Sequence, residues 1–316
     1  DFTRCTVLGM HSRFCYPRRS HVAPFCCLNN STVCNDLILL NYLNSHIIAS
    51  IFTGYHSQEQ FMKKPVIYAL DFDGVICDSA IETGITGWKA AIQIWPDMEA
   101  PLPSTELINQ FRLTRPVIET GFEAILIIRL LYLEQSIESI INNFKSLKQQ
   151  TIVDSNQTPE TLKKLFGNTR DHWIKNNLDE WVAMNPLFPG IREKLKNLNH
   201  QPWAIVTTKQ ERFVAQILAA NEINLPGHCI YGLDRQMSKE AVLSELLEKN
   251  PQQSIHFVED RLPTLLNVIA NDRLSTLTLS FALWGYNTTE DKSSAQSQQR
   301  IHSITLDQFL QDAPHK

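Results

Sequence analysis

Acidic, hydroxyl and amino side chains follow the short apolar runs of this 316-residue sequence at the points where the runs stop. Runs of this length are typical of buried parallel strands. They deliver Asp71 and Asp73 after the first run, Thr207 and Thr208 after the second, and Glu259 and Asp260 after a later one, while Lys239 opens a helical stretch. Ligands of open parallel sheets bind beyond the carboxyl ends of the strands, so we expect these side chains to converge on one rim.

The side chains of this rim suit phosphoryl transfer. Carboxylates that are gathered together repel one another unless a cation neutralises them, and oxygen donors of this kind suit Mg²⁺. A lysine ammonium is a point-charge partner for phosphate, and a threonine hydroxyl can hydrogen-bond phosphate oxygens. A magnesium ion beside a phosphate pocket and a free aspartate favours transfer through an aspartyl-phosphate.

Strand and helix patterns alternate along most of the chain from Met62 onward. The sequence predicts strands at residues 65–70, 203–206, 255–258 and 277–283, with a late strand near Ile301, and helices at residues 190–198, 211–220, 239–249 and 262–270. This alternation predicts an α/β fold, in which a doubly wound parallel sheet of Rossmann-like type carries helices on both faces.

Residues 79–186 interrupt the alternation, and we call them the helical insertion. Helix-spaced apolar residues predict one long helix over residues 121–143 and another over 158–173, with Pro159 at its first position. We therefore expect the core in two parts, residues 62–78 and 187–316, with a mostly α-helical domain inserted between them.

Charge and hydropathy exclude several classes of protein. The net charge is −4 and the pI is about 6.2, without the basic excess of a general nucleic-acid binder or a polybasic membrane patch. The most apolar stretch, residues 37–55, is interrupted by Asn41, Asn44 and His46, so we expect no membrane span. Seven cysteines are too few, and odd in number, for a disulfide scaffold.

Residues 1–61 differ in composition from the rest of the chain. Five of the seven cysteines fall in the first 34 residues, no lysine precedes Lys63, and no strand or helix period is visible. A metal or disulfide module, an organelle transit peptide and upstream sequence joined to a protein that begins at Met62 are the alternatives, and we favour the last. The chemistry is expected elsewhere, and the compartment to be the cytoplasm, or a plastid if the segment is a transit peptide.

Four short motifs in order carry a resemblance to a known family. Asp71-Phe72-Asp73-Gly74-Val75 resembles the first motif of the haloacid dehalogenase-like hydrolases, and Thr207, Lys239 and Glu259-Asp260 resemble the second, third and fourth. Residues 187–191 resemble the segment that re-enters the core after a helical cap, and residues 284–286, followed by Ala295, resemble the tail of phosphoglycolate-phosphatase-type members. The resemblance covers roughly residues 62–310, and it implies that the helical insertion is a cap domain on a haloacid dehalogenase-like core.

The resemblance also implies roles for individual residues. Asp71 is the expected nucleophile and Asp73 the general acid and then the general base. Phosphate contacts are expected from Thr207 and Lys239, with Lys209 as a rival lysine, and substrate contacts from Thr208. The expected magnesium ligands are Asp71, the Asp73 carbonyl, Asp260 and Glu259. Within the cap, Arg112, Arg115, Glu119 and Arg129 are candidates for holding the remote part of the substrate, and Arg115 is the one we select.

The fourth motif departs from the family pattern at two positions. Glu259 stands where the family usually has glycine, and Thr264 stands where a second aspartate is expected. With these changes, metal binding is expected to rest on Asp71, the Asp73 carbonyl, Asp260 and water, with Glu259 as a substitute ligand.

The expected function is that of a Mg²⁺-dependent phosphatase, active as a monomer or homodimer on a small phosphorylated metabolite such as phosphoglycolate or a sugar phosphate. Nucleic acids and membranes are not expected partners. The alternatives are a phosphomutase of the same fold and a catalytically weakened binding or regulatory protein.

Overall fold

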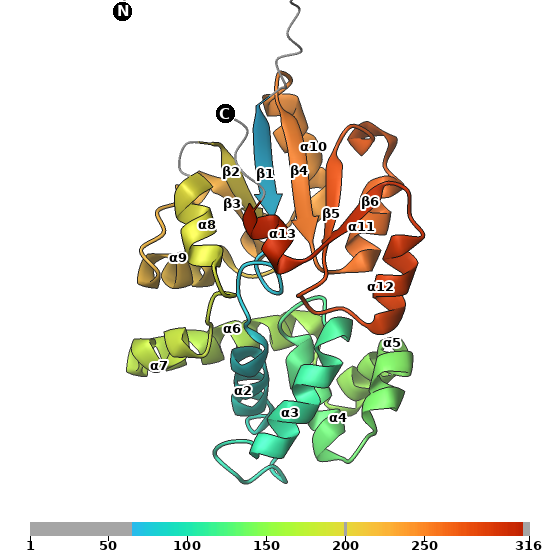
Figure 1. The fold of residues 1–316 in the computed structure, drawn as a ribbon. Coiled ribbons are helices and arrows are strands. Elements are labelled where there is room, and N and C mark those ends of the chain that lie inside the picture. The colour runs from blue at the N-terminus through green and yellow to red at the C-terminus, as the bar shows by residue number, and fades with distance from the viewer. Residues whose placement is uncertain (1–64, 199–200, 312–316) are drawn as a thin grey trace, which may run out of the picture. The chain divides into compact units, whose positions relative to one another are not determined.

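The computed structural model describes residues 65–198 and 201–311, and the statements below refer to these ranges. The expectations for residues 1–61 and for Met62 lie outside them. A six-stranded sheet in which all neighbouring strands run parallel forms the centre of the described chain. Helices cover both of its faces, so the predicted α/β fold class is confirmed (Figure 1).

The sheet has its first strand near the middle. Its order is β3-β2-β1-β4-β5-β6. The strands are β1 (Val66–Leu70), β2 (Trp203–Val206), β3 (Ile230–Tyr231), β4 (Ser254–Glu259), β5 (Thr278–Ala282) and β6 (Ile301–Ile304). The sequence does not predict β3, because two residues are too few to show a period.

Both faces of the sheet are buried. In β1, Tyr68 and Leu70 pack into one hydrophobic core while Ile67 and Ala69 pack into the other, as the alternation of side chains along a strand requires. The first core is covered by α8 (Ile191–Asn197), α9 (Glu211–Ala220) and α13 (Leu306–Gln311), and the second by α10 (Lys239–Lys249), α11 (Leu262–Ile269) and α12 (Thr289–Gln296).

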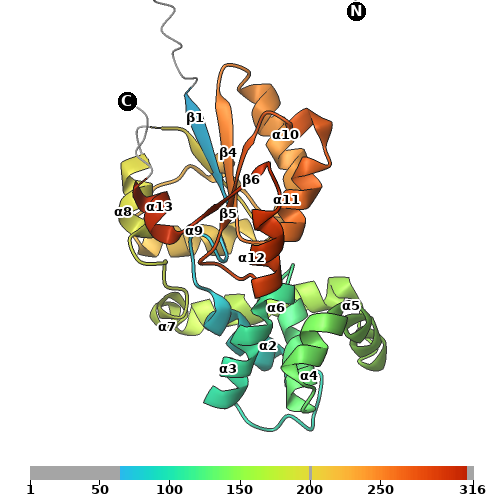
Figure 2. The same ribbon diagram turned by 45° about the vertical axis from the view of Figure 1, so that its right-hand side comes forward.

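The helical insertion forms a separate layer beyond the carboxyl ends of the strands (Figures 1 and 2). A third hydrophobic core, which includes Phe111, Ile125 and Phe166, holds most of it together. Its helices are α2 (Ala80–Ala91), α3 (Thr105–Thr114), α4 (Glu123–Tyr132), α5 (Ile137–Asp154), α6 (Pro159–Asn176) and α7 (Leu178–Ala183). Short 3₁₀ turns lie at η1 (Arg115–Val117), η3 (Gly227–Cys229), η4 (Leu233–Arg235) and η5 (Asp272–Leu274).

The single helix predicted over residues 121–143 is wrong. The chain breaks between α4 and α5, where Glu134 adopts a φ of 59° and the Ser136 side chain accepts a hydrogen bond from the backbone N–H of Ser139. The helical spacing of apolar residues continues from Leu130 and Leu133 to Ile137 and Ile140, so the period does not reveal the break. The helix predicted at residues 158–173 does form, with a Thr158 capping box and Pro159 in its first turn.

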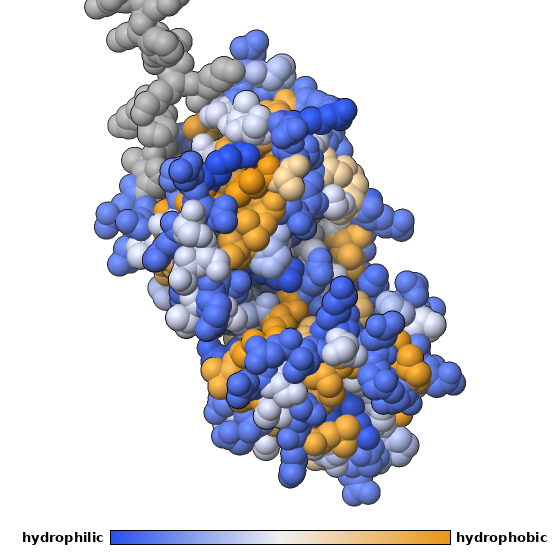
Figure 3. All heavy atoms as spheres, turned by 90° about the vertical axis from the view of Figure 1, so that its right-hand side faces the viewer, coloured by the Kyte–Doolittle hydropathy of each residue, from blue (hydrophilic) through white to orange (hydrophobic). Residues whose placement is uncertain are grey.

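Two neighbouring segments connect the helical insertion to the sheet. The outgoing segment, residues 71–79, runs beside the returning one. Asp78 N–H donates to the Pro186 carbonyl at 2.8 Å, and Phe188 N–H donates to the Ile76 carbonyl at 3.0 Å. Figure 3 shows that the surface of the described residues is indented between the helical insertion and the part that contains the sheet.

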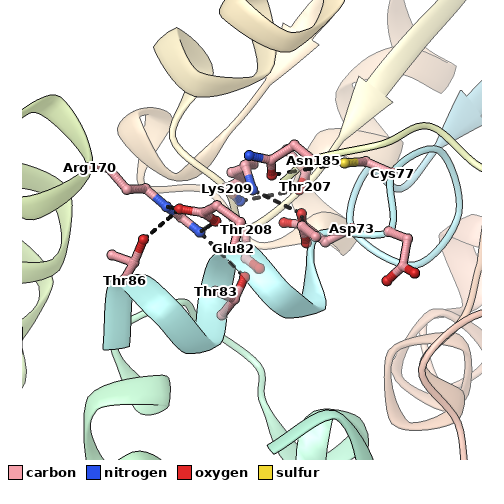
Figure 4. Close-up of polar contacts among 12 residues, drawn as sticks. Asp73, Cys77, Glu82, Thr83, Thr86, Arg170, Asn185, Thr207, Thr208 and Lys209 are labelled. Carbon is pink, nitrogen blue, oxygen red and sulfur yellow. Dashed lines mark hydrogen bonds and ion pairs between the residues drawn. The ribbon is translucent and has the colours of Figure 1, made fainter. Parts of the chain in front are cut away.

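A buried ion pair holds α2, α6 and α7 together. Arg170 donates to both carboxylate oxygens of Glu82, from Nε at 2.8 Å and Nη2 at 2.6 Å (Figure 4). The hydroxyl of Thr86 and the indole N–H of Trp181 also donate to Glu82, at 2.6 and 3.0 Å. Burial alone would raise the pKa of Glu82, but the guanidinium and these donors outweigh it and lower the pKa.

Among the described residues, no helix combines the length and the apolar character that crossing a bilayer demands.

Glu82→Gln should destabilise the fold by about 3–5 kcal/mol, because it leaves the Arg170 charge buried without a counter-ion. The folded-state pKa of Glu82 is lowered, so its contribution is present above the unfolded pKa and is lost as pH falls through the folded pKa. Urea unfolding of wild type and variant at pH 7 and pH 4 measures both effects. The difference in unfolding free energy between the two proteins should be smaller at pH 4.

Arg212→Met is the matched control, because its pair with Asp171 is about half exposed. It should cost no more than about 1 kcal/mol. Equal losses from Glu82→Gln and Arg212→Met would contradict the assignment of the buried pair.

Candidate active site

The strand order brings most of the predicted site residues to one edge of the sheet. β1 lies between β2 and β4, so Asp71, Thr207 and Asp260 follow three adjacent strands. After β1 the chain adds strands on one side, and from β4 onward it adds them on the other. Such a switch point is where open α/β sheets bind ligands.

Lys239 joins two of the carboxylates. Its Nζ lies 2.8 Å from Asp71 Oδ1 and 2.7 Å from Glu259 Oε2. All three side chains are nearly or fully buried. Burial alone would lower the pKa of Lys239, but the two carboxylates outweigh it and raise the pKa, so the ammonium stays charged. The first and third motifs therefore meet directly.

Asp71 is less acidic than an ordinary aspartate. Burial raises its pKa from 3.8 to about 6, with the Glu259 carboxylate adding to the effect and Lys239 opposing it. The carboxylate is therefore mostly ionised at neutral pH and holds its charge at a cost in free energy. Added positive charge at this place would relieve that cost.

Asp260 is buried in a backbone cradle. Its Oδ2 accepts a hydrogen bond from Tyr286 N–H at 2.6 Å, while its buried Oδ1 has no partner among the described residues. A Cβ on Gly74, which has a φ of +97°, would lie 2.0 Å from Asp260 Oδ2, and one on Gly285 would lie 2.3 Å from Asp260 Cβ. Both glycines allow the backbone to approach the carboxylate.

The donors at this edge fit a hard cation. Asp71, Glu259 and Asp260 each offer a carboxylate oxygen, and the three atoms lie within 4.8 Å of one another. Burial and the two neighbouring carboxylates raise the pKa of Asp260 well above its ordinary value, and its Oδ1 is unpartnered. Lys239 offsets part of this charge. An oxygen-only set of this kind, with an orphaned acceptor, suits Mg²⁺.

Asp73 has a different environment from Asp71. Its Oδ1 accepts from the Ser79 hydroxyl at 2.5 Å and from Lys209 Nζ at 2.9 Å, and the side chain of Lys209 is 1% exposed. Burial would raise the pKa of Asp73, but Lys209, Arg115 and the Ser79 hydrogen bond together lower it to about 2. Asp73 is therefore ionised in this arrangement, whereas the general-acid role expected for it requires a proton.

The two threonines after β2 have separate contacts. Thr207 is buried, and its hydroxyl oxygen accepts from Lys209 N–H at 3.1 Å. The Thr208 hydroxyl donates to the carbonyl of Glu119 at 2.7 Å and so connects the core to the helical insertion. Figure 4 shows both threonines beside Lys209 and Asp73.

Asp73 opens onto a small polar cavity between the core and the helical insertion. Its volume is about 40 Å³, and its walls carry Arg115, Lys163, Arg170 and Lys209 as well as Thr208 and Glu119. Arg115 is 7% exposed, lies 4.3 Å from the Tyr286 ring centroid, and has a buried Nε without a partner among the described residues. A buried guanidinium with a free donor favours an anionic or strongly polar occupant.

The other candidates of the helical insertion lie elsewhere. Arg112 pairs with Asp78 at 3.5 Å, and Arg129 pairs with Asp97 at 2.6 Å. Neither arginine lines the cavity.

Thr264, which stands where the fourth motif is expected to have an aspartate, is buried in the first turn of α11.

Sequence reasoning misses several partners of the site. Ser79 and Tyr286 contact Asp73 and Asp260, and Arg170 lines the cavity, but none was assigned a role from its position in the chain. The signal for Arg170 is a charged residue within an otherwise apolar helix face. The sequence favours Lys239 over Lys209, and the structure places both lysines at the site, Lys239 against Asp71 and Lys209 against Asp73.

No protein-family model matches this chain, and no curated protein matches it. Among solved structures, it resembles a predicted phosphoglycolate phosphatase from Haemophilus somnus, with 18% identity and a TM-score of 0.49, over 79% of this chain and 96% of that one. It also resembles a predicted phosphatase from Clostridium acetobutylicum, with 17% identity and a TM-score of 0.47, over 78% and 97%.

A third similar structure is a hydrolase of the haloacid dehalogenase-like family from Streptococcus pneumoniae, with 17% identity and a TM-score of 0.44, over 76% of this chain and 93% of that one. At such identities and TM-scores the likeness carries no argument about function, so the chemistry has to be argued from the contacts of this chain.

Asp71→Asn should flatten the pH dependence of stability in metal-free protein. The folded pKa of about 6 lies above the ordinary 3.8, so the contribution of Asp71 is present below pH 3.8 and is lost as pH rises through about 6. As pH rises from 3.8 to about 6, the unfolding free energy of the wild type should fall by roughly 2–3 kcal/mol through this group. Chemical unfolding in a chelator, at intervals from pH 4 to pH 7.5, measures the difference between wild type and variant.

Added Mg²⁺ at pH 7.5 should raise the midpoint of thermal unfolding of the wild type more than that of Asp71→Asn. Asp97→Asn, a change at a half-exposed aspartate outside the cavity, should respond like wild type. Identical pH profiles and identical responses to Mg²⁺ in wild type and Asp71→Asn would refute both the raised pKa and the cation site.

Proposed function

We propose that this chain is a Mg²⁺-dependent phosphatase of haloacid dehalogenase-like type, which hydrolyses a small phosphomonoester through an aspartyl-phosphate on Asp71. One observation carries the proposal. Asp71 lies at the switch point of a parallel sheet, paired with Lys239 at 2.8 Å and clustered with Glu259 and Asp260 in an oxygen-only set that suits a hard cation. A fixed positive charge and a cation site beside a buried carboxylate are the groups that phosphoryl transfer requires.

The side chains of the rim supply the contacts for a phosphoryl group. Lys239 provides a fixed positive charge next to Asp71, and Thr207 provides a hydroxyl at the end of the adjacent strand. Mg²⁺, when bound by Asp71, the Asp73 carbonyl and Asp260, supplies positive charge that offsets the repulsion between the nucleophile and the phosphate. Glu259 balances Lys239 and lies within reach of the same cation.

Asp71 attacks phosphorus, and the bond between phosphorus and the leaving oxygen breaks. A bound phosphate competes with Asp73 for Lys209, and its negative charge raises the pKa of Asp73, so that Asp73 can carry the proton that the leaving oxygen receives. Asp73 is then ionised again, held by Lys209 and Ser79. It accepts a proton from the water that hydrolyses the aspartyl-phosphate, which releases phosphate and restores the Asp71 carboxylate.

The small size of the cavity favours a small substrate. A volume of about 40 Å³ is far below the 300–1,000 Å³ typical of ligand pockets. The helical insertion must therefore move away to admit a substrate and close afterward, as lids do when they exclude water. Phosphoglycolate and sugar phosphates belong to the size class that we propose, with Arg115 and Thr208 facing the part of the substrate remote from the phosphate.

Asp71→Asn should abolish hydrolysis of phosphomonoesters, because the amide cannot attack phosphorus usefully. Asp73→Asn should retain the attack and lose the proton transfers, which costs about 10²–10⁴-fold in rate. The loss should be smaller for an aryl phosphate, whose leaving oxygen needs no proton, than for an alkyl phosphate. Steady-state rates on both substrates, with mass spectrometry for a phosphoryl adduct, measure these effects, and the adduct should accumulate in Asp73→Asn.

Asp97→Asn is the control and should keep the wild-type rate. Retention of more than a few per cent of the wild-type rate by Asp71→Asn would eliminate the covalent mechanism. A wild type without Mg²⁺-stimulated hydrolysis of any phosphomonoester in a metabolite panel would eliminate the function.

Lys239→Ala and Lys209→Met should have different kinetic signatures. Lys239 faces the nucleophile, so its loss should cost about 10²–10³-fold in kcat/KM, as for other fixed charges aimed at a transition state. Lys209 lowers the pKa of Asp73, so Lys209→Met should move the limb of the pH–rate profile that Asp73 governs to higher pH. Unchanged kinetics in Lys239→Ala, or coincident pH profiles of wild type and Lys209→Met, would remove the corresponding role.

A further inference from the structure

One wall of the cavity is a short loop rather than a helix. Residues 118–122 connect η1 to α4, and all five line the cavity opposite Asp73 and Lys209. A loop in such a position determines how much space a substrate finds. What holds this loop therefore matters for the choice of substrate.

The Glu123 carboxylate holds the loop from behind. Its Oε2 accepts hydrogen bonds from the backbone N–H groups of Glu119 at 2.6 Å and Thr120 at 3.1 Å. Its Oε1 accepts from Lys148 Nζ of α5 at 2.7 Å. The Glu123 side chain is 3% exposed, whereas Lys148 is 31% exposed, so these are partly buried, charge-assisted bonds.

The same loop is held from the core and from α6. The Thr208 hydroxyl donates to the Glu119 carbonyl at 2.7 Å, so the Glu119 residue is bonded through its N–H to Glu123 and through its carbonyl to Thr208. A Cβ added at Gly121 would lie 2.6 Å from the Phe166 ring, which leaves the loop little freedom on that side. Glu123 therefore acts at the one loop residue that also bonds directly to Thr208.

A purely structural role for Glu123 would be that of an acidic residue in the first turn of α4. Such residues usually interact with the free N–H groups of their own helix. The carboxylate of Glu123 instead accepts from residues that precede α4. Its contacts fit the shape of the loop better than the stability of the helix end.

We propose that Glu123 is a positioning residue that, with Lys148, fixes loop 118–122 and thereby determines which phosphomonoesters fit the cavity. The inference rests on the proposed function, because it takes the cavity as the place of the substrate. Glu123 does not line the cavity, so it acts through the loop.

Glu123→Gln is the central variant, because it keeps the shape of the side chain and removes the charge that both backbone donors and Lys148 use. The KM for phosphoglycolate, as a compact probe, should rise about fivefold or more, as expected for the loss of charge-assisted hydrogen bonds. The kcat for 4-nitrophenyl phosphate should stay within about twofold of wild type, because the groups at Asp71 and Asp73 are untouched.

Hydrogen exchange provides a readout that does not depend on activity. The amides of Glu119 and Thr120 should exchange about tenfold faster in Glu123→Gln, because their acceptor is weakened. Lys148→Met tests the same link without altering the carboxylate and should shift both readouts in the same direction. Lys145→Met, a change of an exposed lysine on the same helix, should shift neither.

The outcomes separate the two proposals. A lowered unfolding midpoint in Glu123→Gln and Lys148→Met, with KM and the exchange of both amides as in Lys145→Met, would mean a structural role and overturn the inference. A wild type inactive on all phosphomonoesters would overturn the proposed function and the substrate-selecting role with it. The exchange rates would still decide whether Glu123 holds the loop.

Discussion

The arrangement of the site depends on the balance of charge at the carboxyl ends of β1 and β4. Asp71, Glu259 and Asp260 are buried together, and each pair of neighbouring carboxylates raises the cost of ionisation. Lys239 offsets part of this cost by pairing with Asp71 and Glu259. The remaining excess of negative charge, and the unpartnered Oδ1 of Asp260, make this edge receptive to a cation. Glu259, which departs from the family pattern, thus serves as the counter-ion of the lysine.

The two aspartates of the first motif gain different properties from their surroundings. Asp71 faces other carboxylates and has a raised pKa, whereas Asp73 faces Lys209 and Arg115 and has a lowered one. The two carboxylates of one loop therefore differ in how readily they hold a proton. Lys209 pairs with Asp73 just as Lys239 pairs with Asp71, so each aspartate has a lysine of its own.

The helical insertion is attached to the core through apolar and polar contacts. Trp181 of α7 packs against Phe213 of α9 within the first hydrophobic core, with ring centroids 5.9 Å apart. Within the insertion, the buried Glu82–Arg170 pair holds α2 against α6, and Arg170 also borders the cavity. Toward the core, the Thr208–Glu119 hydrogen bond spans the indentation between the two parts. The Thr208–Glu119 contact is a single hydrogen bond, which can break and form again at modest cost.

The sequence alone determined the elements whose patterns are local. β2, α9 and α10 occupy the predicted residues. The period of a strand or helix, and its capping residues, depend only on residues within that segment. The break between α4 and α5 was not visible, since the helical spacing of apolar residues continues across Glu134 and only packing favours its left-handed backbone. Which lysine meets which aspartate, and that Asp73 is held ionised, were decided by the tertiary structure. Those pairings join residues more than a hundred positions apart, and their distances follow from the strand order, which no local pattern contains.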